Sequence, residues 1–165
     1  MKRLVATFAA VANLVLADAV TKELACGLLK GRGPVELLSV FNLAYVENRG
    51  CAWGMFQGAV WPLAAFGLVA LAFLVWKRRY VFGDAFFAPC LLYADIVGNV
   101  IDRLFRGFVV DMLDFHWGAS HFPCFNLADS YICIAVGLMM LGAARPSRRA
   151  AAKAAEGGGK GESAR

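Results

Sequence analysis

Charged residues are scarce in this sequence. Of its 165 residues only 18% are charged, whereas 60% are hydrophobic. A soluble domain carries about a quarter charged residues, so the composition argues against one large aqueous core. The apolar residues gather in four blocks, each close to the ~20 residues that a helix needs to cross a bilayer. The composition therefore predicts a small helical bundle in a membrane.

Patterns that mark several other protein classes are also missing. The net charge is +5, but no basic patch with interleaved aromatic residues is present, so we expect no nucleic-acid binding. No G-x-S-x-G motif marks a serine hydrolase. The cysteines number five, and an odd count without regular spacing predicts no disulfide framework. A Cys26–Cys51 or a Cys51–Cys124 bridge stays open.

The apolar blocks predict four membrane spans, at residues of about 4–24, 59–76, 85–101 and 127–144. Eleven of the 17 Lys and Arg residues lie before the first block, between the second and third, or after the fourth. These places share one side of a four-span chain, and the positive-inside rule makes that side cytoplasmic. Both termini should then be cytoplasmic, with loops of about 25–58 and 103–126 on the outside.

The expected fold class is an all-α membrane protein with four transmembrane helices and a small β-rich periplasmic loop region. That region is placed at about 38–56, which is rich in strand-forming residues and followed by glycines. Residues 1–145 should form one domain. Residues 146–165, which hold almost no large apolar side chain, should be a disordered, basic cytoplasmic tail.

The first apolar block could instead be a cleaved signal peptide, because Cys26 ends a stretch that resembles a lipoprotein cleavage site. Asp18, Lys22 and Glu23 interrupt that stretch, however, and three further spans follow it. We therefore expect the first block to be retained as a membrane span.

Several polar residues are predicted to lie at one depth, near the outer face of the bilayer. At a rise of ~1.5 Å per residue, Asp18 lies about 21 Å along the first span. Others lie where the third span ends and the fourth begins: Asn99, Asp102, Arg103, Asn126 and Asp129. Helix ends commonly carry charge, and Asp18 with Lys22 could be a simple i,i+4 ion pair. Ionisable groups inside spans are nevertheless costly, so their convergence on one level suggests a site.

Two aspartates at this level suggest the chemistry. Like charges at close range cannot both ionise, so Asp111 and Asp129 would share one proton. The ionised member can deprotonate a water while the protonated member hydrogen-bonds a peptide carbonyl. This chemistry hydrolyses an amide without a metal or another cofactor. Asp114, three residues beyond Asp111, is expected to face the membrane surface as a polar anchor.

Five stretches, taken in order, resemble the lipoprotein signal peptidase family, also called signal peptidase II. They are Asp18-x-x-x-Lys22, NRGCAWG at 48–54, GNVIDR at 98–103, VVDMLDF at 109–115 and FNLADS at 125–130. One such motif alone is weak, whereas five in order on four spans are highly specific. The resemblance covers about residues 4–144.

The resemblance implies an intramembrane aspartic endopeptidase. It would remove the signal peptide from diacylglyceryl-modified prolipoproteins, cleaving before the lipidated cysteine. Asp111 and Asp129 would be the catalytic dyad. The supporting and substrate-binding residues would be Asp18, Lys22, Asn48, Gly50, Asn99, Asp102, Arg103 and Asn126. We expect Asp102 to hold Arg103 or the end of its span. The expected setting is the bacterial cytoplasmic (inner) membrane, in contact with lipid, with the site near the periplasmic face and the protein a monomer.

Two alternatives and one departure accompany this interpretation. A small proton-coupled transporter or channel could use Asp18, Asp95 and Asp102, although these groups do not run across the bilayer. A zinc hydrolase could use His116, His121 and Cys124, although their spacing fits no standard zinc motif. The departure is Ala94-Asp95-Ile96, where the family usually has Gly-Gly-Ala. For Asp95 we expect no more than an interhelical hydrogen bond.

Overall fold

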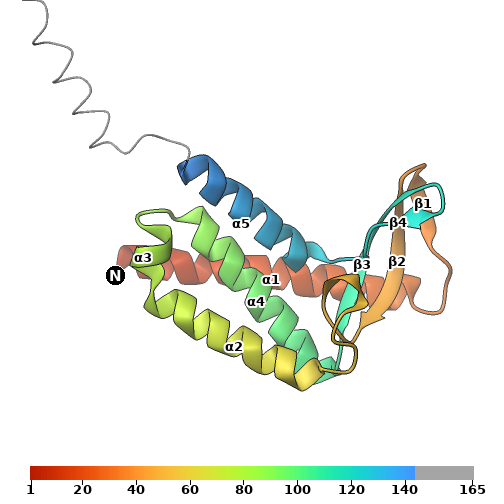
Figure 1. The fold of residues 1–165 in the computed structure, drawn as a ribbon, viewed down its shortest axis with the longest axis horizontal. Helices are drawn as coiled ribbons and strands as arrows, with labels where there is room; N and C mark the ends of the chain where they lie inside the picture. The colour runs from red at the N-terminus through yellow and green to blue at the C-terminus, as the bar shows by residue number, and fades with distance from the viewer. Residues whose placement is uncertain (144–165) are drawn as a thin grey trace, which may run out of the picture.

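The computed structural model describes residues 1–143, a bundle of helices with a β-sheet at one end (Figure 1). The helices are α1 (Lys2–Leu29), α2 (Val60–Trp76), α3 (Arg78–Phe82), α4 (Phe87–Arg106) and α5 (Leu127–Ala143), with a short 3-10 helix, η1, at Ala52–Gly54. The strands are β1 (Val35–Leu38), β2 (Phe41–Asn48), β3 (Val109–Trp117) and β4 (Ser120–His121). The predicted tail, 146–165, lies outside the described residues.

Helix α4 is the centre of the bundle, because it packs against α1, α2 and α5. It ends at Gly107, which adopts the left-handed conformation (φ 77°) that favours glycine at a helix terminus. In the described chain only α1, with 28 residues, is both long and apolar enough to cross a membrane by length and composition. Helices α2 and α5 are apolar but shorter, and α4 carries Asp95, Asp102, Arg103 and Arg106.

The polarity of the bundle is the reverse of that in a soluble protein. Large apolar side chains cover its outside, and Phe8, Phe66 and Trp76 are each more than 70% exposed. Charged groups lie inside, where Asp18 and Lys22 are each 1% exposed. An apolar surface of this extent indicates contact with membrane, and inward-facing charges are the arrangement that lipid imposes.

The sheet is antiparallel in the order β1-β2-β3-β4. Strands β2 and β3 form its central pair, in which Val46 lies opposite Asp111 and Asn48 lies opposite Val109. The register shifts between Leu43 and Val46, which marks a bulge or irregularity. This pairing brings the end of β2 and the start of β3 together beside the C-terminal ends of α1 and α4 (Figure 1).

The predicted all-α class, with β structure only at about 38–56, was therefore too simple. The protein is mostly helical with a four-stranded sheet, and both segments predicted as outer loops, 25–58 and 103–126, contribute strands to it. The sequence Val109–Trp117 mixes β-branched, aromatic and acidic residues and is too short and polar for a span. It forms a strand because β2 offers it an edge with which to pair.

Candidate active site

The first turn of α5 holds Asp129 through a reciprocal pair of hydrogen bonds. The backbone N–H of Asn126 donates to Asp129 Oδ2 (3.1 Å), and the backbone N–H of Asp129 donates to Asn126 Oδ1 (3.0 Å). Asn126 directly precedes the helix, so the two residues satisfy backbone N–H groups that the first turn would leave free. The N-x-x-D spacing in the sequence thus fixes the Asp129 carboxylate at the helix start.

Asp111 lies on β3 and is 2% exposed. Its two carboxylate oxygens accept hydrogen bonds from Asn48 Nδ2 (2.9 Å) and Asn126 Nδ2 (2.8 Å). Burial and the charge of Asp129 raise the pKa of Asp111 to about 7, against the opposing effect of these two hydrogen bonds. A carboxyl group with this pKa is partly protonated at neutral pH and can serve as an acid.

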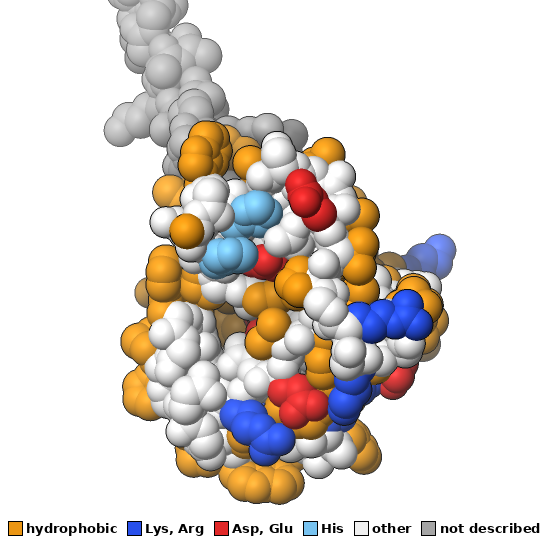
Figure 2. Space-filling view, turned by 90° about the vertical axis from the view of Figure 1, so that its right-hand side faces the viewer, with side chains coloured by type: hydrophobic (Ala, Val, Ile, Leu, Met, Phe, Trp, Pro, Cys, Tyr) orange, Lys and Arg blue, Asp and Glu red, His pale blue; other side chains and the backbone are white. Residues whose placement is uncertain are grey.

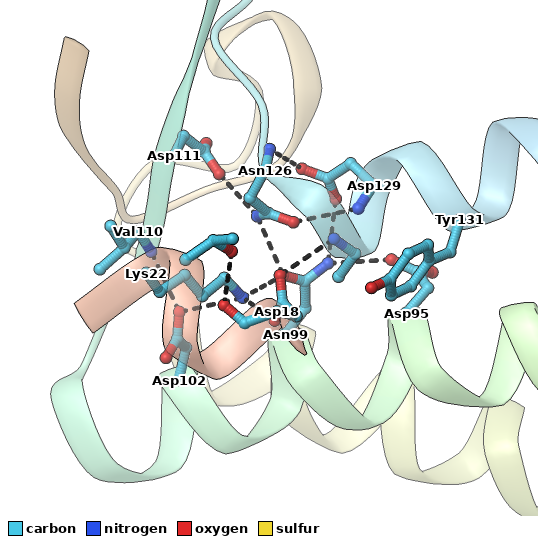
Figure 3. A network of polar contacts seen from close by, with 12 residues as sticks. Asp18, Lys22, Asp95, Asn99, Asp102, Val110, Asp111, Asn126, Asp129 and Tyr131 are labelled. Atoms are coloured by element: carbon cyan, nitrogen blue, oxygen red, sulfur yellow. Dashed lines mark hydrogen bonds and ion pairs between the residues drawn. The ribbon is translucent and has the colours of Figure 1, made fainter. Parts of the chain in front are cut away.

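Asn99 joins Asp129 and Asn126 to the charged interior of the bundle (Figure 3). Its Nδ2 donates to Asp129 Oδ1 (2.9 Å) and to Asp95 Oδ1 (3.0 Å). Its Oδ1 accepts from Lys22 Nζ and from Asn126 Nδ2, both at 3.2 Å. Both ends of the amide are therefore occupied, which fixes its orientation.

Arg103 connects α4 to the loop after β2. Its guanidinium donates to the backbone carbonyl of Gly50 (3.1 Å) and to that of Asn99 (3.2 Å). Gly50 also donates its N–H to Asn48 Oδ1 (2.9 Å). A Cβ at position 50 would collide with the backbone oxygen of Met55, so the tight loop beside the site requires glycine here.

A second layer of charge lies behind these residues. Lys22 Nζ contacts Asp18 Oδ2 (2.8 Å) and Asp102 Oδ2 (3.2 Å), and all three side chains are 6% exposed or less. Asp18 Oδ1 accepts the N–H of Ala128 (3.0 Å), and Asp102 Oδ2 accepts that of Val110 (3.1 Å). The Asp18–Lys22 pair is thus more than a surface ion pair, because it fastens α1 to the start of α5 and to β3.

Three expectations about aspartates need correction, one of them only in part. Asp102 does not pair with Arg103, but it does hold the end of its span: it pairs with Arg106 in the last turn of α4, and also with Lys22. Asp95 makes its hydrogen bond within its own helix, to Asn99 one turn later, rather than to another helix.

The third is Asp114, which is not an exposed anchor. It is 7% exposed and bound by Asn42 Nδ2 (3.2 Å) and His121 Nδ1 (2.8 Å). Burial raises its pKa, but these two hydrogen bonds together with the neighbouring His121 and His116 rings hold the pKa of Asp114 below its ordinary value.

The zinc alternative finds no support in the geometry. Among residues 1–143, no group of three or more His, Cys, Asp or Glu residues could hold a metal ion. His116 stacks on His121 (ring centroids 5.2 Å apart), and the two rings lie side by side on the sheet end of the molecule (Figure 2). All five cysteines are free, so neither bridge that the sequence left open is formed.

Comparison with known proteins identifies the family. The family model described as signal peptidase (SPase) II matches residues 10–145. A lipoprotein signal peptidase of Shewanella loihica is 41% identical over 133 residues, covering 76% of this chain and 78% of the relative. One of Syntrophotalea carbinolica is 38% identical over 139 residues, covering 79% and 86%. The chain belongs to the signal peptidase II family.

Solved structures agree with this membership. A bacterial membrane enzyme at 2.3 Å resolution superposes with a TM-score of 0.73 and 30% identity, covering 83% of this chain and 86% of that one. A second, at 1.9 Å, gives a TM-score of 0.72 at 28% identity, covering 86% and 94%. Signal peptidase II is an aspartic peptidase, and membership displaces the transporter alternative.

The site of this signal peptidase II opens into two adjoining cavities. One, of about 320 Å³, is lined by Asp129, Asn99 and Arg103. The other, of about 600 Å³, is lined by Asp111. Asn48, Trp53 and Phe122 line both. Asp111 and Asp129 therefore line adjoining space in which an extended peptide could lie.

Sequence reasoning missed the aromatic rim of these cavities. Trp53, in η1, meets Phe122 edge to face with ring centroids 5.7 Å apart. Phe122 in turn meets Phe125 at 5.9 Å. Trp53 also adopts a positive φ of 62°, which is uncommon for a bulky residue. The nearest signal in the sequence was the glycine-rich setting of Trp53, which indicated an unusual loop but no contact with Phe122.

Proposed function

We propose that this signal peptidase II removes the signal peptide from diacylglyceryl-modified prolipoproteins by cleaving before the lipidated cysteine. The catalytic groups are Asp111 and Asp129. One observation carries this proposal: Asn126 binds both aspartates, Asp111 through its side chain and Asp129 through its backbone N–H. A single residue thus holds two carboxyl groups beside connected cavities.

In the proposed mechanism the pair shares one proton. Asp111 holds the proton, which the rise of its pKa to about 7 favours, and Asp129 is ionised. Asp129 takes a proton from a water, and the resulting hydroxide attacks the scissile carbonyl carbon. Asp111 donates its hydrogen bond to the carbonyl oxygen and stabilises the developing charge. The amine then leaves with a proton from the dyad, and the pair returns to its singly protonated state.

The supporting residues divide into three groups. Asn48, Asn99 and Asn126 donate amide hydrogen bonds to the dyad and hold both carboxyl groups in place. Arg103 lines the cavity beside Asp129 and supplies N–H donors for a backbone carbonyl of the substrate. Gly50 keeps the loop narrow at this point. The third group is the ionic framework that joins α1, β3 and α5 behind the two aspartates. It consists of Asp18, Lys22 and Asp102.

The proposed setting is the bacterial inner membrane, with α1, α2, α4 and α5 as four spans and both termini cytoplasmic. The site then lies near the periplasmic face, at the end of the bundle that carries the sheet. Exposed apolar side chains along the helices support contact with lipid on all sides. We propose a monomer, because one chain supplies both aspartates and all three asparagines.

The test is cleavage of a purified prolipoprotein by the purified enzyme. Cleavage is expected with the diacylglyceryl-modified form and is expected to be absent with the same prolipoprotein lacking the lipid. It should survive excess chelator, because two carboxyl groups suffice to activate water. Equal cleavage of the two forms would reject lipid recognition. Loss of activity in chelator that added zinc restores would reject a metal-free aspartic mechanism.

A further inference from the structure

Asp95 is a buried carboxyl group that the mechanism does not use. It lies on α4, one turn before Asn99, and is 8% exposed. Its Oδ1 accepts a hydrogen bond from Asn99 Nδ2 at 3.0 Å. Within the described chain, Asn99 is the one side chain that hydrogen-bonds Asp95. Whatever Asp95 does through a directed contact, it does through Asn99.

The same nitrogen of Asn99 also serves the dyad. Nδ2 carries two hydrogens, one directed at Asp95 Oδ1 and the other at Asp129 Oδ1 (2.9 Å). In a planar amide these hydrogens point about 120° apart, so the two carboxylate oxygens lie about 5 Å from each other. Figure 3 shows Asn99 between Asp95 and Asp129.

This arrangement fixes which way the Asn99 amide faces. A flipped amide would direct its oxygen at two carboxylates and its NH2 group at Lys22 Nζ, which is itself a donor. With Asp95 present, the correct orientation satisfies both hydrogens. Without it, one hydrogen of Nδ2 would be left unpaired in a buried position.

The other charged groups near Asp95 do not compete for its hydrogen bond with Asn99. Asp18 and Lys22 on α1 and Asp129 on α5 lie near enough to act on Asp95 through their charges. Helix α2, which also packs on α4, contains no charged residue. Lys22 is held by Asp18, Asp102 and Asn99.

We infer that Asp95 is a positioning residue for peptide cleavage. It orients Asn99, and Asn99 in turn holds Asp129 in the geometry needed to activate water. The inference rests on the proposed function, because it assigns Asp129 a role in catalysis. It requires an acceptor at position 95, and asparagine can supply one.

The first experiment compares Asp95→Ala with Asp95→Asn in cleavage of the lipid-modified prolipoprotein. Asp95→Ala should lower kcat about tenfold and change KM less than about twofold, because a misplaced catalytic group affects turnover more than binding. Asp95→Asn should stay within about threefold of wild-type kcat. Tyr93→Phe is the matched control: Tyr93 lies on the same helix and donates to the Leu74 carbonyl (3.3 Å) without contacting Asn99.

The second experiment tests whether the effect passes through Asn99. In an Asn99→Ala background, under single-turnover conditions that make slow rates measurable, Asp95→Ala should change the rate less than about twofold. Thermal unfolding identifies any variant that does not fold, and Asp95→Leu, which likewise carries no acceptor, then replaces Asp95→Ala.

Three results would overturn the inference: wild-type kcat in Asp95→Ala, equal damage in Asp95→Ala and Asp95→Asn, or undiminished damage in the Asn99→Ala background. If the wild-type enzyme itself fails to cleave, the proposed function fails instead, so the two failures are distinguishable.

Discussion

Asn126 and Asp129 each accept a hydrogen bond from the other's backbone N–H, at 3.1 and 3.0 Å. The side chain of Asn126 meanwhile donates to Asp111 at 2.8 Å. The geometry of the dyad is therefore set by the first turn of α5 and by a single residue before it. The two carboxyl groups are expected to act as a unit.

The first prediction concerns that unit. Asp111→Asn and Asp129→Asn should each lower the cleavage rate by about 10²–10⁴-fold, because an amide cannot exchange the required proton. The double variant should be scarcely slower than either single variant. Rates and substrate binding should be measured for all three, and binding should persist. A single variant that keeps more than about a tenth of the wild-type rate would contradict the acid–base role.

The second prediction concerns pH. Because the pKa of Asp111 is about 7, its proton is lost above this pH and the cleavage rate should fall. The profile should be bell-shaped and report the pair rather than either residue.

Stability should respond to the same proton. Folding raises the pKa of Asp111 from 3.8 to about 7. The contribution that protonated Asp111 makes to the free energy of unfolding is therefore complete below pH ~4 and is lost as pH rises to about 7. Relative to wild type, Asp111→Asn should gain on the order of a few kcal/mol between pH 4 and pH 8. Denaturation at both pH values measures this change, and a difference that does not vary with pH would contradict the raised pKa.

The third prediction separates Asp114 from Asp111. Asp114→Asn should keep cleavage within about threefold of wild type, because Asp114 binds Asn42 and His121 rather than the dyad. It should lower Tm at neutral pH. The pKa of Asp114 is held below 3.8, so its stabilising effect is present above that pH and disappears as pH falls through the lowered value. Equal loss of activity in Asp111→Asn and Asp114→Asn would mean that the dyad is wrongly assigned.

The fourth prediction concerns the ionic framework. Lys22→Met should destabilise the protein by about 3–5 kcal/mol, since it leaves Asp18 buried without a cation and leaves Asp102 with Arg106 alone. Lys30→Met is the control, because Lys30 pairs with Glu47 at 3.3 Å on the surface, where ion pairs contribute little. Unfolding in detergent of both variants should show a large effect for Lys22 alone. Similar stability of the two variants would show that the buried network is dispensable.

The fifth prediction concerns topology. Reporter fusions placed after Lys77 and after Ala144 should both report a cytoplasmic location, as the distribution of Lys and Arg predicts. A fusion in the turn between β3 and β4, at Gly118, should report the opposite side. An outward signal at either of the first two sites would overturn the four-span arrangement.

Short motifs made much of the site predictable from the sequence. The N-x-A-D and V-V-D stretches placed Asp129 and Asp111 correctly in one cluster, because each carboxyl group is held by local structure and by asparagines that the motifs contain. Lys22 and Asp18 could be placed by depth alone, since charged groups in an apolar span must turn inward.

Long-range contacts could not be predicted in the same way. The role of Val109–Trp117 as a strand depends on pairing with β2, which lies more than 60 positions earlier in the chain. Asp102 was expected to hold Arg103 or the end of its span, and helical spacing turns it toward Arg106 at that end and toward Lys22 on another helix. The Trp53–Phe122 contact joins two loops, and the sequence of neither loop predicts contact with the other.

The position of the two aspartates along the chain also governs when the enzyme can first act. Asp111 and Asp129 follow α1, α2 and α4 in the order of synthesis, and Asp129 takes its place only when the first turn of α5 has formed. Its partner Asn99, and Asp18, which binds the neighbouring Ala128, are synthesised earlier. A nascent chain therefore lacks one of the two proposed catalytic aspartates until its last described helix is made, and we expect it to have no peptidase activity before then.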